Sequence, residues 1–141
     1  MKKIILMVLL LTSSQMAMAV NWVYVGNTSK LNLYIDYDSA TLKNFDGGRG
    51  NYINAWVKAK YNQAQKLSNN SYYWENTMLG YYDCKNNKYN GNNVIWYDKA
   101  GNVVLQINPY VSTNSSNNWD LAPPDSAGLA QLRLVCSWFG M

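Results

Sequence analysis

Cys84 and Cys136 are the two residues whose type and spacing most clearly indicate chemistry. A metal site would need further ligands at a recognisable spacing, and the chain contains no histidine. A catalytic thiol would need a base such as histidine, which is absent for the same reason. Two thiols without such partners favour one intramolecular disulfide, which forms in an oxidising environment. The sequence therefore predicts a Cys84–Cys136 disulfide in an exported chain.

An export signal stands at the start of the chain. Residues 1–19 begin with a basic pair, continue with a short apolar run and end in an Ala-Met-Ala triplet. This pattern is typical of a secretory signal peptide that is cut after residue 19. The apolar run is shorter than the roughly 20 residues of a spanning helix, and no cysteine marks a lipid-attachment site, so we expect no membrane anchor. Residues 20–141 should form one exported domain, located in the periplasm, at the cell surface or outside the cell.

Other catalytic groups are scarce. Glu75 is the single glutamate, and no nucleophile-elbow motif occurs. Asp36 and Asp38 stand two residues apart and would shift each other's pKa if they were close, but carboxylates at a strand end commonly face water. Metal binding by these two together with Asp46 lacks the spacing of a calcium loop. We therefore expect no enzyme, no metal and no cofactor.

The charge of the chain limits its partners. Twelve basic and eight acidic residues give a net charge of +4, and removal of the two signal lysines would leave ten basic residues. Arg49 and Arg133 stand apart from each other, and no basic run occurs. Nucleic acid is therefore not an expected partner.

The remaining sequence predicts the elements that position these residues. Twelve tyrosines and six tryptophans favour strands, and asparagine-rich stretches favour turns. Alternating or strand-forming runs predict strands at 21–27, 31–37, 52–61, 72–84, 88–98 and 103–109. Residues 62–71 are expected to form a polar connector with room for a helical turn. A hairpin turn is expected around Gly101.

One helix is expected at the C-terminus, within 122–136. Asp125 or Ser126 can cap its first turn, after two prolines. Four residues recur at helical spacing and would pack on the sheet: Leu129, Leu132, Val135 and Cys136. The predicted fold is therefore α+β, an antiparallel sheet of about six strands with a C-terminal helix packed on it and one disulfide.

Aromatic and cationic side chains of the third predicted strand are the candidates for binding. Such residues are common anchors of interfaces, and on this strand they lie opposite the apolar face formed by Ile53, Ala55 and Val57. A helix that covered their face would instead make Trp56 a core residue. The candidates are Tyr34, Tyr52, Trp56, Lys58 and Lys60, with Lys85 and Lys88 beside the first cysteine as a second patch.

Several short motifs follow one another along residues 20–141. They are Trp22, YID at 34–36, AWVK at 55–58, YYDC at 81–84, YDKAGNVV at 97–104, Trp119, APPDS at 122–126 and LVC at 134–136. Their order and spacing resemble the surface-adhesin protein E family of Gram-negative bacteria. The resemblance implies an antiparallel sheet with a C-terminal helix, a tendency to form homodimers, and host adhesion through matrix or serum glycoproteins.

Two classes of function remain open at this point. The first is a non-enzymatic adhesin with a protein or glycoprotein ligand, as the resemblance implies. The alternative is a periplasmic inhibitor or immunity-type protein that blocks a toxin or a wall-degrading enzyme. An adhesin must reach the outer surface of the cell, whereas an inhibitor can remain in the periplasm.

Overall fold

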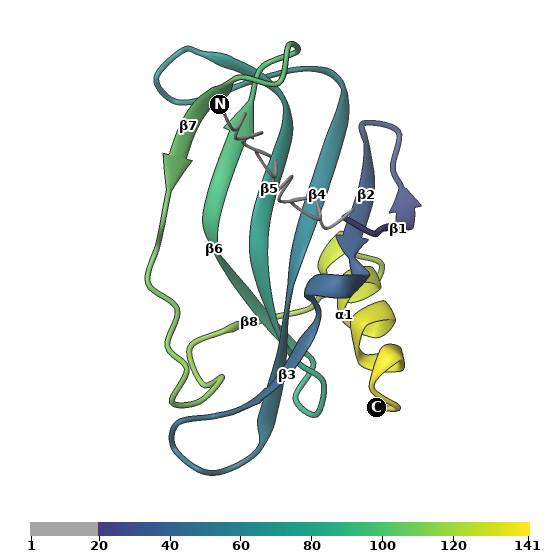
Figure 1. Ribbon diagram of the computed structural model, residues 1–141, viewed down its shortest axis with the longest axis vertical. Coiled ribbons are helices and arrows are strands. Elements are labelled where there is room, and N and C mark those ends of the chain that lie inside the picture. Colours follow the sequence, from purple (N-terminus) through teal and green to yellow (C-terminus); the bar gives the residue numbers. More distant parts are fainter. Residues whose placement is uncertain (1–19) are drawn as a thin grey trace, which may run out of the picture.

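The computed structural model describes residues 20–141, so the predicted signal peptide at 1–19 lies outside the described residues. The described part is a mostly antiparallel sheet with one C-terminal α-helix (Figure 1). The strands are β1 Trp22–Asn27, β2 Leu31–Asp36, β3 Thr41–Asn44, β4 Asn51–Lys66, β5 Tyr72–Asp83, β6 Lys88–Tyr97, β7 Val103–Ile107 and β8 Asp120–Leu121. A short 3-10 helix covers Tyr37–Ser39, and α1 covers Ala127–Trp138.

The sheet has eight strands in the order β1-β2-β4-β5-β6-β7, with β3 paired to β4 and β8 paired to β6. The six strands of the main path correspond to the six predicted ones, which confirms the α+β class. The strand count was too low because β3 has four residues and β8 has two. Segments this short leave too few positions for an alternating pattern to be recognised.

The expected connector at 62–71 is wrong over its first half, because β4 continues to Lys66. Gln65 and Lys66 pair with Tyr73 and Tyr72 after an irregularity in the register. Most side chains of residues 62–66 are polar and exposed, so apolar and polar residues do not alternate here. A strand without a buried face gives no period-two signal.

β2 and β3 line the same edge of β4, and the 3-10 helix interrupts them. The helix leaves a gap in the ladder at Trp56, whose backbone N–H donates to Ser39 Oγ at 2.9 Å. The Asp36 carboxylate accepts backbone N–H bonds from Asp38 and Asn21, each at 3.2 Å. Because its carboxylate accepts the Asp38 N–H, Asp36 is the N-cap of the 3-10 helix, and it is buried.

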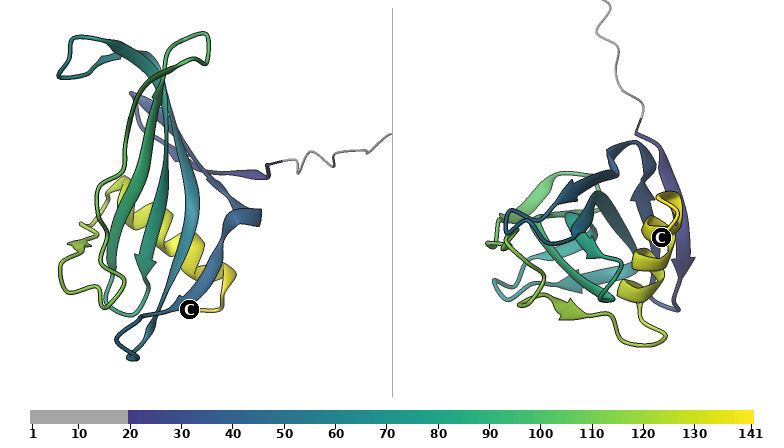
Figure 2. Two further views of the ribbon diagram at one scale, coloured as in Figure 1. Left: turned by 60° about the vertical axis from the view of Figure 1, so that its left-hand side comes forward. Right: turned by 90° about the horizontal axis from the view of Figure 1, so that it is seen from below.

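The helix α1 covers one face of the sheet (Figure 2, left). Ser126 Oγ accepts the Leu129 backbone N–H at 3.1 Å, which selects one of the two predicted caps. Leu132, Val135 and Cys136 then lie in a core cluster with buried residues of three strands, which are Ile35, Ile53, Ala55, Val57 and Tyr82. Leu129 is only half-buried, and Gln131 is buried in its place.

The predicted disulfide is present between Cys84 and Cys136, whose Cα atoms lie 5.8 Å apart. It connects the residue after β5 with the last turns of α1, as the sequence analysis anticipated. The bridge therefore fixes a helix that packs on the sheet along one side only.

A second core cluster lies on the opposite face of the sheet. Its buried members are Phe45, Tyr52, Tyr81, Val111 and Trp119. The segment between β7 and β8 covers this face, and the Trp119 indole N–H donates to the Ser112 carbonyl at 3.0 Å. Both clusters lie toward the end of the sheet that carries β3 and β8, whereas the β4–β5 and β6–β7 turns extend beyond α1 (Figures 1 and 2).

Candidate binding surface

Aromatic and cationic side chains gather on one face of β1, β2 and β4. The register places Tyr24 opposite Tyr34 and Tyr34 opposite Lys58, so these three form a row across the strands. Side chains two residues apart on a strand share a face, which adds Trp22 and Lys60. We call these five residues the cation–aromatic face.

Lys58 is at the centre of the cation–aromatic face. Its Nζ lies 4.0 Å from the ring centroid of Trp22 and 5.6 Å from that of Tyr34. The Tyr24 and Tyr34 rings meet edge to face at 5.7 Å. A cation over an aromatic ring is stabilised by about 0.5–1 kcal/mol at an exposed site. Lys58 is thus held in one position rather than free in solvent.

Burial lowers the pKa of the Lys58 ammonium, the nearby Glu75 carboxylate opposes this shift, and Lys60 adds to it. Lys60 itself pairs with Glu75 at 3.7 Å, with 52% and 31% of the two side chains exposed. An exposed pair at this distance contributes little to stability. The Lys60 ammonium therefore remains accessible to a ligand.

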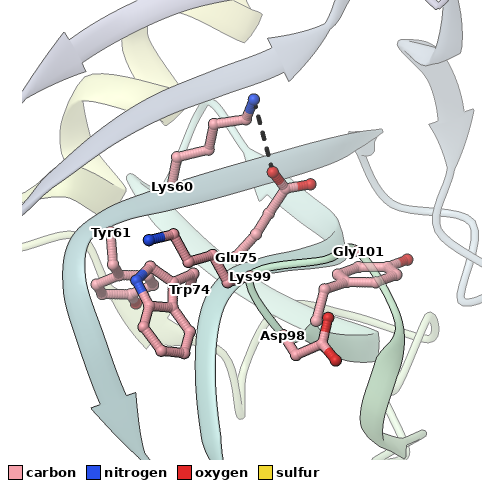
Figure 3. A pocket seen from close by; sticks show the side chains of 8 residues that line it. Lys60, Tyr61, Trp74, Glu75, Asp98, Lys99 and Gly101 are labelled. Atoms are coloured by element: carbon pink, nitrogen blue, oxygen red, sulfur yellow. Dashed lines mark ion pairs between the residues drawn. The ribbon is translucent and has the colours of Figure 1, made fainter.

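A cleft of about 330 Å³ adjoins the cation–aromatic face at Lys60 (Figure 3). We call it the upper cleft, and its lining residues are Lys60, Tyr61, Trp74, Glu75, Tyr97, Asp98, Lys99 and Gly101. The register between β4 and β5 passes from Lys60–Glu75 to Gln65–Tyr73, so β4 carries extra residues here. Such irregularities interrupt the ladder and redirect side chains, which opens the cleft.

Two polar groups of the upper cleft are already engaged. The Asp98 carboxylate accepts bonds from the Ala100 and Asn102 backbone N–H groups and from the Asn102 side chain, which together lower its pKa. Burial, with the neighbouring Tyr73, raises the pKa of Tyr61 to about 12. Asp98 therefore maintains the turn, and Tyr61 is a neutral phenol at physiological pH.

The structure brings together three of the predicted binding residues, Tyr34, Lys58 and Lys60. Trp56 lies on the same face of β4, is half-buried and belongs to neither core cluster. Tyr52 does not belong to this surface, contrary to the prediction, because only 6% of it is exposed. It shares the strand face of Lys58, but the β7–β8 segment with Trp119 covers that end of the face.

The second predicted patch is split by its contacts. Lys88 Nζ donates to the carbonyls of Ser116 and Asn117, each at 3.0 Å, so this lysine holds the β7–β8 segment. Lys85 is exposed beside a separate cleft of about 200 Å³ that Arg49 also lines. Any binding role of these two lysines stays a prediction.

Sequence reasoning missed several residues of this region. Trp22 and Tyr24 alternate on the first predicted strand, so an assumed register with the second strand would have placed them beside Tyr34. The sequence carries no comparable signal for Trp74, Tyr97 and Lys99, which the β5–β6 register and the β6–β7 turn bring together beside Lys60 and Tyr61 of β4.

Within residues 20–141, no group of three or more acidic or cysteine side chains is arranged to hold a metal ion. No helix in this range has the length and hydropathy that a membrane span requires.

An antiparallel sheet with one disulfide-linked C-terminal helix is the architecture of the described residues. The chain belongs to the surface-adhesin protein E family, whose sequence model matches residues 22–137. No curated protein and no solved structure gives a significant match. Membership implies an adhesin-like protein that is exported to the cell surface.

Proposed function

We propose that the protein is a non-enzymatic adhesin that binds a host matrix or serum glycoprotein through the cation–aromatic face. Membership of the family supports adhesion as the task. The observation that carries the choice of surface is the position of Lys58 beside the Trp22 and Tyr34 rings. The helix α1 packs on the opposite face of β4, and the β7–β8 segment covers the face of Lys58 only at its other end, around Tyr52.

The composition of this face suits a protein ligand. Tyrosine and tryptophan provide large contact areas and lose little conformational entropy when they bind. More than half of Tyr24 is exposed, at 52%, while Trp22 and Tyr34 are half-buried. Both of these rings contact Lys58, and Tyr34 also contacts Tyr24, so the side chains of the face are ordered by one another. An ordered surface costs less entropy on binding than a mobile one.

The electrostatics of the face favour acidic or carbonyl-rich partners. Lys58 and Lys60 supply two positive charges, and Glu75 neutralises only part of them through a long ion pair. A carboxylate of the partner that approached Lys58 would meet an ammonium that has already lost part of its hydration, as its lowered pKa indicates. Such contacts determine orientation and specificity more than total affinity.

The test is a double variant, Lys58→Ala with Lys60→Ala, measured by surface plasmon resonance on immobilised basement-membrane extract and serum glycoproteins. We expect about a tenfold or greater loss of affinity, the size of effect that one anchor residue commonly gives. The melting temperature should change little, because both lysines contribute only exposed or half-exposed contacts.

The matched control is Lys43→Ala with Lys66→Ala, which removes the same charge from exposed positions of β3 and β4 outside the face. The control should bind as the wild type does. Equal losses in both double variants would show that net charge, rather than this face, determines binding. Unchanged affinity in the first variant would rule out the face as the binding surface.

A further inference from the structure

The upper cleft combines aromatic rings with both lysines and carboxylates, whereas the five residues of the cation–aromatic face include no carboxylate. Aromatic side chains line it from β4, β5 and β6, namely Tyr61, Trp74 and Tyr97. Its volume of about 330 Å³ lies at the lower end of ligand sites, which span roughly 300–1,000 Å³. Its lining residues come from β4, β5, β6 and the β6–β7 turn, at the end of the sheet that extends beyond α1 (Figure 2). Figure 3 shows these side chains from close by, and a ligand attached to a larger molecule can reach a cleft in this position.

Donors and acceptors face the cleft beside the aromatic rings. The Lys60–Glu75 pair is the one ion pair found in residues 20–141, so the ammonium of Lys99 has no carboxylate partner in that range. Glu75 can accept further hydrogen bonds, because its contact with Lys60 is long, at 3.7 Å. Donors on Lys60 and Lys99 and remaining acceptor positions on the Glu75 carboxylate are therefore available in one open cleft.

The charges of the cleft balance. Two lysines, Lys60 and Lys99, stand against two carboxylates, Glu75 and Asp98. A strongly anionic ligand would meet both carboxylates, and a cationic ligand would meet both lysines. An apolar ligand would leave the charged groups without hydrogen bonds, which is costly. The best match is a neutral molecule that has an apolar face and both donates and accepts hydrogen bonds.

We propose that the upper cleft binds a neutral sugar residue of a glycan, which rests on the proposed function in that the glycan belongs to the glycoprotein ligand. A pyranose ring presents C–H groups on one face, which pack against Trp74 or Tyr97, and hydroxyls at its rim. Hydroxyl groups donate to Glu75 and accept from Lys60 and Lys99. Lys60 connects the two surfaces, so the sugar and the protein part of one ligand can be bound together.

The first experiment is saturation-transfer difference NMR of the exported protein with glucose, galactose, mannose, N-acetylglucosamine and lactose as probes. We expect saturation transfer to at least one sugar, and at least about a tenfold weaker response for Trp74→Ala, the size of loss that removing an aromatic anchor gives. Tyr110→Ala is the matched control, because this tyrosine is 86% exposed and lies outside the cleft. Transfer to none of the sugars at millimolar concentration, or transfer that Trp74→Ala leaves unchanged, overturns the proposal.

A second variant keeps the test valid if Trp74→Ala unfolds. Lys99 is exposed in the β6–β7 turn, so Lys99→Ala should fold as the wild type does, which circular dichroism checks. We expect it to weaken the sugar response in the same direction. A response equal to that of the wild type, in a variant that is folded, removes Lys99 from the site and contradicts the proposed hydrogen bonding.

A second experiment separates this proposal from the proposed function. The matrix and serum glycoproteins are tested before and after enzymatic removal of their glycans. Loss of binding on deglycosylation supports both proposals. Binding that survives deglycosylation without change supports the adhesin and overturns the sugar site. A sugar response without any glycoprotein binding supports the cleft as a sugar site and contradicts the proposed ligand of the adhesin.

Discussion

Gly80 is required by packing along its own strand, against the Tyr82 side chain, rather than by backbone conformation. A Cβ added at this position would lie 2.5 Å from the Tyr82 hydroxyl and 2.8 Å from its ring. Tyr82 is 1% exposed and is hydrogen bonded to Gln131, so its ring has little room to move. Glycine is therefore required at position 80, next to the Tyr82 ring.

Gly80→Ala should lower the free energy of unfolding by about 1–3 kcal/mol, the usual cost of overpacking a core. Gly91→Ala is the matched comparison, because Gly91 pairs with Gly80 but its added methyl group would meet the flexible Met78 side chain. We expect a smaller loss for Gly91→Ala in urea unfolding. Equal losses, or none for Gly80→Ala, would contradict a rigid Tyr82.

Asp83 is a buried carboxylate that fixes two loops. It is 1% exposed and accepts the Asn86 side-chain N–H at 2.7 Å, the Asn86 backbone N–H at 3.1 Å and the Ser116 hydroxyl. Asp83→Ala should cost about 1–3 kcal/mol, since it leaves the buried Ser116 hydroxyl without a partner. Chemical denaturation measures this. The exposed Asp120 gives the control Asp120→Ala, and a loss of the same size there would argue against a specific role of Asp83.

At the scale of elements, the β6–β7 turn depends on one carboxylate. Hydrogen bonds from Asn102 and Ala100 lower the pKa of Asp98 below its ordinary value. A lowered pKa stabilises the folded state above the unfolded pKa of about 3.9, and this contribution is lost as the pH falls through the folded pKa. Asp98→Asn should therefore lower the melting temperature at pH 7.

The same variant should have little effect on the melting temperature at pH values well below the ordinary pKa, because the wild-type carboxyl is then protonated too. Thermal unfolding of both proteins over a pH series measures the difference, and an NMR titration of the Asp98 carboxyl measures its pKa directly. A difference in melting temperature that does not depend on pH would indicate that the carboxylate charge is not what stabilises the turn.

The helix α1 depends on its disulfide. The bridge closes a segment with a sequence separation of 52 residues. On the chain-entropy model, removing it by Cys84→Ala with Cys136→Ala should cost about 4 kcal/mol of unfolding free energy. Urea unfolding with and without reductant tests this, because reductant should destabilise the wild type and leave the double variant unchanged. A wild-type midpoint in the double variant would show that packing alone holds α1.

At the scale of the whole molecule, the location of the protein separates the two classes of function. Protease treatment of intact cells should cleave a surface adhesin, since a protein on the outer surface is accessible to the protease. The same treatment after the outer membrane is opened is the control for protein kept inside. Protection in intact cells would favour the periplasmic inhibitor. The expected homodimer also stays a prediction, which sedimentation analysis over a range of concentrations tests.

The sequence predicted the fold wherever one face of an element is buried. Alternation identified β2 and the first half of β4 because α1 covers one face of each, and helical spacing identified α1 for the same reason. The end of β4, residues 62–66, was missed because most of its side chains are polar and exposed. Alternation of apolar and polar residues indicates a buried face, so a strand that is exposed on both faces has no alternating pattern.

The binding surface was predicted only in part, for a different physical reason. Tyr52 and Lys58 share one face of β4, and their sequence pattern does not distinguish them. A segment about 60 residues further along the chain, around Trp119, covers the first and leaves the second exposed. Strand alternation is a local property, whereas the covering of a face depends on distant segments.

The sequence by itself determined the disulfide, the helix, the main strands and the family, since each depends on residue types or on local spacing. Only the tertiary structure decided which aromatic residues are core, that Trp22 and Tyr34 hold Lys58, and that an irregular β4 opens the upper cleft. These features depend on the register between strands and on the irregularity in the β4–β5 pairing. Both arise only when segments that are far apart in the chain form pairs.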